Sequence, residues 1–366
     1  MTGISAGGRA PVRCSFRSKP PALRGSGMID TTAAVSTESL GACPLCDGTS
    51  WRSLPVPGRW IGSEVFGDLD GAVGLVRCHK CGLVFTNPRP SSERLSAFYS
   101  GGTYACHEST GATTAGARAD VILERIAKHL PREAPRVLLD YGAGGGGFLI
   151  HASNRGWEVR GFEPGKRGLE SCRRAGLRVT DSLEDLPGGE FGLVTMCHVF
   201  EHLAHPKEVL EGVRRFLAPE GRLFIEVPNA RSLRARLAIP FLSRRFRIDE
   251  RFRAYPIHLM YYSEQTLREM LGRAGWTVEK TFTIGVGLEE FFVQLESSHA
   301  ETGRERSEPE VVRTRKRRLR HLLRDAFLNA GLGENLAVIA YPSGGPTCNP
   351  TGPQIPSLPW SDSRSG

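Results

Sequence analysis

The run Gly142-Ala-Gly-Gly-Gly-Gly147 constrains the fold of this chain more than any other stretch. A short apolar run, residues 137–139, precedes it and has the length of a buried strand. Residues 148–154 are predicted to form the helix that follows, and residues 157–162 a second strand. Because glycine lacks a Cβ, the loop can turn tightly and its backbone can approach a ligand. The sequence therefore predicts a strand–loop–helix–strand unit with a ligand-binding loop.

The acid that closes the second strand indicates what kind of ligand this loop binds. Glu163 follows Gly142 by 21 residues (163 − 142), the spacing at which an acid meets a ribose. Gly142, Gly144 and Gly147 also satisfy the dinucleotide pattern G-x-G-x-x-G, so a dehydrogenase is a weaker alternative. Asp140, just before the loop, would repel a pyrophosphate but suits the cationic ammonium of S-adenosylmethionine.

This stretch resembles motif I of class I S-adenosylmethionine-dependent methyltransferases. The resemblance implies S-adenosylmethionine as cofactor, with Glu163 as the acid that binds its ribose. It departs from the family at Gly192, where an acid is usual. The residues that we expect to contact the cofactor are Asp140, Gly142, Ala143, Gly144, Gly146, Glu163, Asp181, Cys197 and His198.

A second series of motifs extends the resemblance to about residues 40–285. Glu201-His202, then Pro219-Glu-Gly221, then Val227-Pro228-Asn229 resembles a run found in ubiquinone-type and polysaccharide-cluster methyltransferases. The order of these motifs agrees with the alternation of helices and strands in an α/β fold. The implied fold is a Rossmann-like sheet of seven strands with helices on both faces.

Two C-x-x-C knuckles predict a metal site ahead of this fold. Cys43 and Cys46 form the first, Cys78 and Cys81 the second, and residues 47–77 separate them. Four thiolates make the closed tetrahedral site typical of structural zinc. A redox C-x-x-C would need a thioredoxin-like context, which the sequence lacks. We therefore predict a zinc-ribbon-like module, with His79 as a solvated neighbour of the ligands.

The stretch Tyr255-Pro-Ile-His258 resembles the tyrosine-x-glutamate-histidine element of zinc-containing sugar C-methyltransferases, which also carry an N-terminal zinc module. Ile257 stands where that family has its glutamate. The resemblance implies His258 as a base, Tyr255 as a ligand of the acceptor oxygen, and His202 in an orienting or packing role. The region after residue 285 is too short and too basic for the family's C-terminal domain, which favours a hydroxyl- or amine-bearing acceptor.

Composition bounds the domains and the compartment. The net charge of +9 comes mainly from arginines in late segments, and no apolar run is long enough to span a membrane. Paired cysteines and no secretory signal indicate a cytoplasmic protein, whose translation starts at Met1 or Met28.

We expect disordered tails over residues 1–38 and 342–366, a zinc-binding module over 39–105, a methyltransferase domain over 106–285, and a C-terminal helix and last strand over 286–341.

Three functions compete on these features. The first is methyl transfer from S-adenosylmethionine to a small molecule: a sugar, a polysaccharide precursor or a natural product. The second is an RNA methyltransferase in which the zinc module and the basic helix 313–328 hold nucleic acid, but base-stacking aromatics are missing between the knuckles. The third is a non-catalytic zinc-ribbon adaptor, against which the intact glycine loop and Glu163 argue. The arginine-rich segment 230–256 is either a cap over the substrate or a surface loop.

Overall fold

The structure is a computed structural model. It describes residues 37–55, 69, 72–100, 112–237, 255–285 and 322–344, all of which belong to one unit, Val35–Gly366. Most of both predicted tails, the connection at 101–104 and most of the arginine-rich segment lie outside these ranges.

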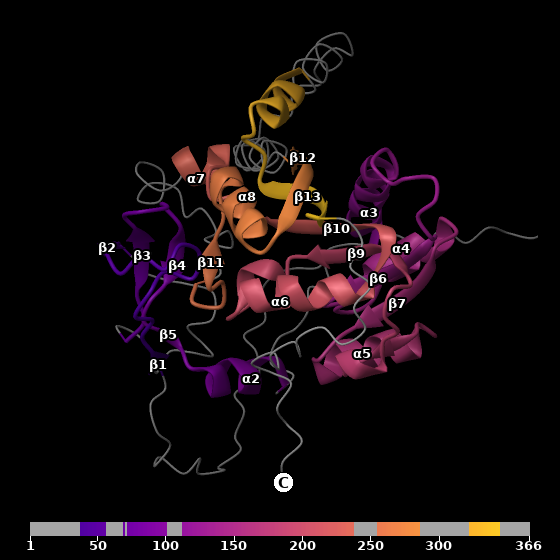
Figure 1. Ribbon diagram of the computed structural model, residues 1–366, viewed down its shortest axis with the longest axis horizontal. Coiled ribbons are helices and arrows are strands. Elements are labelled where there is room, and N and C mark those ends of the chain that lie inside the picture. Colours follow the sequence, from indigo (N-terminus) through magenta and orange to yellow (C-terminus); the bar gives the residue numbers. More distant parts are fainter. Residues whose placement is uncertain are drawn as a thin grey trace, which may run out of the picture. The chain divides into compact units, whose positions relative to one another are not determined.

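A sheet of seven strands forms the centre of the molecule (Figure 1). Its spatial order is β12-β13-β10-β9-β6-β7-β8. β13 runs antiparallel to both neighbours, whereas β10, β9, β6, β7 and β8 pair in parallel. The predicted seven-stranded Rossmann-like sheet is thereby confirmed. The strands are β6 (Val137–Tyr141), β7 (Glu158–Phe162), β8 (Val179–Thr180), β9 (Phe191–Cys197), β10 (Leu217–Pro228), β12 (Trp276–Ile284) and β13 (Asn335–Pro342).

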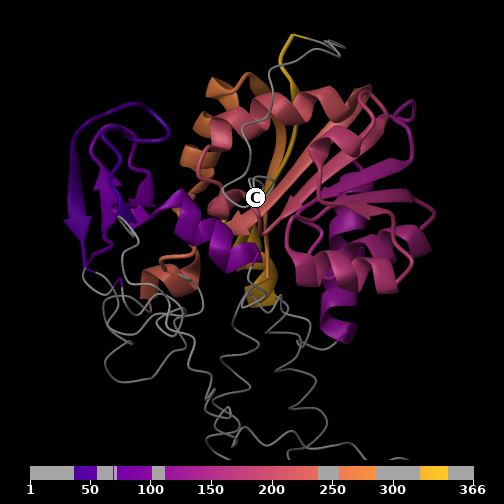
Figure 2. The same cartoon turned by 90° about the horizontal axis from the view of Figure 1, so that it is seen from below.

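Helices cover both faces of this sheet (Figure 2). One face packs on α3 (Ala112–Ala127), α4 (Gly147–Asn154) and α5 (Lys166–Arg174), and the other on α6 (Pro206–Val213) and α8 (Glu264–Arg273). Alternate residues of a strand point to opposite faces, so Leu138 packs with the α3 side and Leu139 with the α6 side. Burial on both faces explains why the central strands are almost continuously apolar.

The sequence pattern predicts a helix over residues 209–217 and another over 264–274. The first is present as α6, which begins three residues earlier, at Pro206, and ends at Val213. Pro206 is compatible with the first helical turn because the amide hydrogen that it lacks would have no intrahelical partner there. A single 3₁₀ turn, Arg214–Phe216, follows, and Leu217 already belongs to β10. The second is present as α8, which ends at Arg273 and has a capping box between Ser263 and Thr266.

The cysteine-rich segment forms a small sheet with a strand from elsewhere in the chain. Its order is β11-β4-β3-β2, in which β11 (Met260–Tyr261) pairs antiparallel with β4 (Val84–Thr86). The other strands are β2 (Trp51–Leu54) and β3 (Leu75–Cys78). Thr37 and Glu38, at the end of the tail predicted to be disordered, form β1 and pair with β5 (Arg89–Pro90).

The same segment shares a hydrophobic core with the large sheet. Leu45, Val76 and Phe85 belong to one buried cluster with residues of α6 and α8. Arg89 is only 3% exposed and binds both Glu38 Oε1, at 2.6 Å, and the carbonyl of Ala204, at 3.3 Å. Helix α2 (Ser92–Ser100) leads from this segment toward the large sheet.

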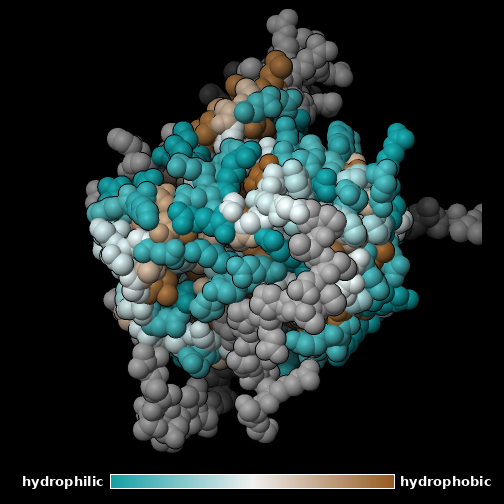
Figure 3. All heavy atoms as spheres, in the orientation of Figure 1, coloured by the Kyte–Doolittle hydropathy of each residue, from teal (hydrophilic) through white to brown (hydrophobic). Residues whose placement is uncertain are grey.

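The face of the molecule shown in Figure 3 is mostly hydrophilic. A helix over 322–329 carries two exposed leucines, Leu322 and Leu323, and packs back on β12 through a hydrogen bond from Thr283 Oγ1 to the carbonyl of Leu328. It is the described part of the helix predicted over 313–328. A short helix, α7 (Leu233–Leu237), follows β10. Within the described residues no helix is long and apolar enough to cross a membrane.

Candidate functional site

The glycine loop lies between β6 and α4 and is tied to β7. The amide groups of Gly142 and Ala143 donate to the carbonyl of Phe162, at 2.8 and 3.0 Å. Gly142 has φ +84°, and a Cβ there would stand 2.5 Å from Val199 Cγ2, so a side chain is excluded twice. Gly146, in the left-handed region at φ +83°, precedes the first residue of α4. The loop thus presents backbone at the carboxyl end of the sheet, where α/β folds bind ligands.

Glu163 lies directly after β7 and faces this loop. Its Oε2 accepts a hydrogen bond from the amide of Gly144 at 2.6 Å, and its Oε1 accepts one from Gly165 at 2.8 Å. Burial raises the pKa of Glu163, and these two amides oppose the rise. The carboxylate is therefore held at the rim of the loop, at the place expected for a ribose-binding acid.

Asp140 is buried at the end of β6. Thr195 Oγ1, from the adjacent strand β9, donates to Asp140 Oδ1 at 2.7 Å. Burial raises the pKa of Asp140 to about 7, the Thr195 hydroxyl opposes this, and the charge of Glu163 adds to it. A cation beside such a buried carboxyl favours its ionised form, which fits a cationic cofactor.

Two of the remaining predicted cofactor contacts lie at the end of β9 and one lies apart. Cys197 is the last residue of β9 and is half-buried, and His198 follows it. Asp181 is exposed just after β8. All nine cofactor contacts stay predictions, since the structure contains no ligand. At Gly192, where the family has an acid, a Cβ would collide with the carbonyl of Pro135, which explains the departure.

A cluster of titratable side chains lies beyond the ends of β9 and β10, next to the glycine loop. Glu201 and His202 belong to a 3₁₀ turn, Phe200–His202, and His258 comes from the stretch before β11. Glu201 Oε1 is 3.9 Å from His202 Nε2 and 3.9 Å from His258 Nε2. All three residues are buried, and Glu201 is only 1% exposed. We name these three residues the Glu–His cluster.

Backbone contacts bring the distant His258 to this turn. The amide of Leu259 donates to the carbonyl of Glu201 at 2.9 Å. From the other side, Thr86 donates through its hydroxyl to the carbonyl of His258 and through its amide to that of Leu259, each at 2.9 Å. His258 is therefore placed by both the large sheet and the cysteine-rich segment.

His198 flanks the Glu–His cluster and is fixed by an arginine. Its Nδ1 lies 3.4 Å from Glu201 Oε1, and Arg118 Nη2 lies 2.6 Å from its Nε2. The same Arg118 atom pairs with Glu226 Oε1 at 2.6 Å. His198 adopts φ +56°, a strained conformation for a residue with a side chain.

The predicted acceptor residues occupy different places around the cluster. Tyr255 is buried three residues before His258, and its ring packs in a separate apolar cluster with Ile257. His202 Nδ1 contacts the carbonyl of Ile257 at 3.1 Å and the hydroxyl of Tyr99 at 2.9 Å. Sequence reasoning noted that Ile257 lacks the family's carboxylate, and Glu201 supplies one from another segment.

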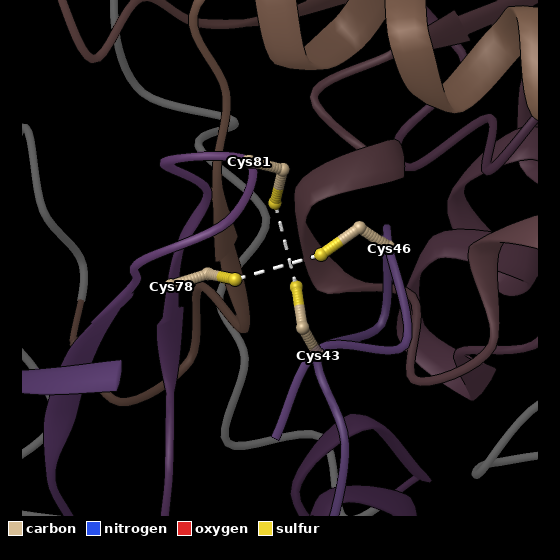
Figure 4. Close-up of side chains that lie close together, drawn as sticks. All are labelled: Cys43, Cys46, Cys78 and Cys81. Atoms are coloured by element: carbon tan, nitrogen blue, oxygen red, sulfur yellow. Dashed lines mark hydrogen bonds between the residues drawn. The ribbon is translucent and has the colours of Figure 1, made fainter. Parts of the chain in front are cut away.

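The four predicted metal ligands converge on one point (Figure 4). The Sγ atoms of Cys43 and Cys81 are 3.6 Å apart, and those of Cys46 and Cys78 are 3.5 Å apart. A Zn–S bond of about 2.3 Å puts the sulfurs of a tetrahedron about 3.8 Å apart, close to these distances. His79 is exposed and pairs with Ser50 Oγ at 3.0 Å, outside the group. The arrangement fits a closed structural metal site.

Residues 115–281 match the family model described as a methyltransferase domain. This stretch is similar to a methyltransferase domain and makes up 167 of the 366 residues (281 − 115 + 1). The chain is 32% identical to the ubiquinone biosynthesis O-methyltransferase of Methylococcus capsulatus over 114 residues. The matched stretch covers 28% of this chain and 48% of that protein. The protein of the same name from Erwinia tasmaniensis is 27% identical over 120 residues, 30% of this chain and 49% of that protein. The chain thus spans about half the length of the curated relatives it matches.

Solved structures similar to the chain include a SAM dependent methyltransferase from Archaeoglobus fulgidus and the [4+2]-cyclase SpnF. The first is 23% identical, with a TM-score of 0.39 over 63% of this chain and 94% of that one. The second is 18% identical, with a TM-score of 0.43 over 70% and 99%.

Three charged residues of this site were missing from the predicted set. Glu201 was passed over in favour of His202, although both belong to the same motif. Arg118 and Glu226 come from α3 and β10 and carry no motif of their own. Only the fold brings them to the end of β9.

Proposed function

We propose that this protein transfers a methyl group from S-adenosylmethionine to the oxygen of a small-molecule acceptor. The observation that carries the proposal is the glycine loop with Glu163 at its rim, inside the stretch that matches a methyltransferase domain. The relatives named as O-methyltransferases of ubiquinone biosynthesis support a hydroxyl on a small molecule as the acceptor. Within that class we favour a sugar, a polysaccharide precursor or a natural product.

The cofactor's adenosyl part lies along the glycine loop in this proposal. Glu163 binds the ribose hydroxyls, and Asp140 faces the positively charged amino acid end. Asp181 lies on the side of the adenine, whereas Cys197 and His198 lie on the side of the methyl group. Methyl transfer from a sulfonium is an in-line displacement, so holding the acceptor oxygen in line with the methyl supplies much of the rate.

The acceptor is activated at the Glu–His cluster. Its members lie beyond the end of β9, beside the loop, on the edge of the sheet where α/β folds bind substrates. His258 activates the acceptor, and Tyr255 binds the acceptor oxygen. His202 fixes the position of His258 relative to Glu201 through its bond to the carbonyl of Ile257.

Cys43, Cys46, Cys78 and Cys81 hold one structural zinc ion in this proposal. The sulfur spacing supports it, and four free thiols suit a reducing compartment such as the cytoplasm. The ion stabilises the small sheet, which then positions the stretch that contains His258 through β4 and β11.

Titration calorimetry with S-adenosylmethionine tests the central claim. Glu163→Ala removes hydrogen bonds to a charged group and should weaken binding by about 1.5–3 kcal/mol, or roughly 10- to 150-fold. Glu170→Ala, an exposed acid on α5, is the matched control and should bind as the wild type does. Equal affinities for wild type and Glu163→Ala, or tight binding of NAD, would contradict the proposal.

A further inference from the structure

The Glu–His cluster contains a buried carboxylate, Glu201, with only a long contact of 3.4 Å to His198 Nδ1. Among the described residues, neither oxygen of Glu201 accepts a well-formed hydrogen bond, and both oxygens are shielded from solvent. A buried carboxylate of this kind is costly unless a hydrogen-bond donor or a cation compensates it. The donor atoms of Glu201, His202 and His258 all lie within 4.8 Å of one another. Three ligands of two types that metals favour, one carboxylate and two imidazoles, thus meet at one buried point.

The hydrogen bonds of His202 turn its metal-binding nitrogen toward Glu201. Nδ1 of His202 lies 3.1 Å from the carbonyl of Ile257, which can only accept, and 2.9 Å from the hydroxyl of Tyr99, which can accept as well as donate. Both contacts are hydrogen bonds when Nδ1 carries the proton. Nε2 then keeps its lone pair, and it is this atom that lies 3.9 Å from Glu201 Oε1. Such an outer bond to a carbonyl is the usual way in which a metal-binding histidine is oriented.

His198 belongs to the surroundings of the cluster by the same reasoning. Arginine only donates, so Arg118 Nη2 makes His198 Nε2 an acceptor, and Nδ1 carries the proton that points at Glu201 Oε1. His198 therefore orients the carboxylate. The rings of His202 and His258 meet edge to face, with centroids 4.7 Å apart.

We propose that Glu201, His202 and His258 bind one divalent transition-metal ion, separate from the ion of the four cysteines. Two imidazoles and a carboxylate are a donor set for ions such as zinc, iron(II), manganese(II) or cobalt(II), and the nitrogen ligands argue against calcium and magnesium. Donor atoms around zinc lie about 3.4 Å apart, so only a small contraction from 3.9 Å is needed. Three protein ligands leave positions for an outside molecule.

The inference deepens the proposed function, because the ion would bind and polarise the acceptor hydroxyl, but metal binding itself does not depend on methyl transfer. Such an ion lowers the pKa of a bound hydroxyl and so favours its ionised, more nucleophilic form.

Cobalt(II) titration of the full-length protein tests this site. The zinc content of the purified protein is measured first. A mild chelator then removes loosely held metal, while the site of the four cysteines keeps its ion. We expect one cobalt(II) per chain, with visible d–d bands and without the thiolate-to-cobalt charge-transfer band that a cysteine site gives. His258→Gln and Glu201→Gln should each weaken cobalt(II) binding at least about 100-fold, the upper end of what loss of an outer partner costs.

His205→Gln is the matched control. His205 is an exposed histidine three residues after His202, outside the cluster, and its loss should leave cobalt(II) affinity within about 2-fold of the wild type. Circular dichroism and calorimetry with S-adenosylmethionine show whether each variant is folded. Absence of cobalt(II) binding by the wild type, or binding that both cluster variants retain, would overturn the inference. A protein that binds cobalt(II) here but not S-adenosylmethionine would overturn the proposed function alone.

Discussion

The cofactor side and the acceptor side of this site are built in different ways. The cofactor side lies mostly in one stretch, from Asp140 at the end of β6 to Glu163 after β7, where loop amides bond to Phe162 and Glu163. The acceptor side joins Glu201 with His258, 57 residues later (258 − 201), and depends on Thr86 of the cysteine-rich segment for its backbone contacts. The first side depends mainly on contacts between adjacent strands of the large sheet, whereas the second depends on packing between two parts of the chain.

Removal of the proposed zinc ion should have the largest effect and should affect the acceptor side but not the cofactor side. Structural zinc contributes about 10–16 kcal/mol in zinc-finger peptides, so a chelator under reducing conditions, or Cys78→Ser, should unfold the small sheet. β11 then loses its partner β4, and methyl transfer should be abolished. Affinity for S-adenosylmethionine should change by less than about 3-fold, because the glycine loop makes no contact with that sheet in any described hydrogen bond.

Amide hydrogen exchange locates this effect. Protection should fall over residues 72–86 and 259–262 and persist over 137–163. His79→Gln, between two cysteines but outside the metal group, is the matched control and should keep zinc, protection and activity. If metal removal also abolishes cofactor binding, the two sides are not separable.

Substitution of His258 should have the next largest effect. His258→Ala should lower turnover by roughly 10²- to 10⁴-fold, the range associated with loss of a group that handles the acceptor's proton, with cofactor affinity unchanged. His202→Ala should in addition lower the melting temperature, since it removes buried contacts to Ile257 and Tyr99. His205→Gln again serves as the control. If His258→Ala turned over as fast as the wild type, the assignment of the acceptor side to the Glu–His cluster would be wrong.

The same contrast explains what could be predicted from the sequence. The loop, its acid and the two cysteine knuckles depend on residues a fixed number of positions apart, and glycine spacing or paired cysteines reveal them directly. The seven-stranded sheet was implied by the resemblance to methyltransferases, and the order of the motifs agrees with it. The start of α6 differs from the prediction because Pro206 can begin a helix, and its end differs because Leu217 already belongs to β10.

The acceptor side could not be predicted in the same way. Glu201 faces His258 only because β11 pairs with β4 and Leu259 bonds to the turn at Glu201. Ile257 suggested that His258 has no acidic neighbour, since local spacing shows nothing about a carboxylate from another segment. Arg118 likewise reaches His198 from a helix that precedes the whole sheet. These contacts are properties of the tertiary structure.

The smallest predicted effect concerns pH and the cofactor side alone. Because burial raises the pKa of Asp140 to about 7, a large share of the protein carries a neutral carboxyl at that residue just below neutrality. The positively charged cofactor binds the ionised form, so its affinity should rise with pH through about 7, by at most about 10-fold per pH unit below the pKa. The unliganded fold should show the opposite sign: between about pH 4 and 7 its Asp140 holds a proton that the unfolded chain has lost, so stability falls as pH rises across that window and levels off above it.

Calorimetry at roughly pH 6 and 8 measures this dependence, and Asp140→Asn should remove it, because an amide does not titrate in that range. Adenosine, which lacks the charged end, should bind equally at both values, and this controls for Glu163, whose pKa is also raised by burial. His258→Ala should keep the full dependence of the wild type, since His258 belongs to the other side. If the affinity for S-adenosylmethionine did not depend on pH, Asp140 would not contact the charged end of the cofactor. A dependence lost in His258→Ala but kept in Asp140→Asn would instead show that the two sides titrate together, which the single continuous stretch from Asp140 to Glu163 argues against.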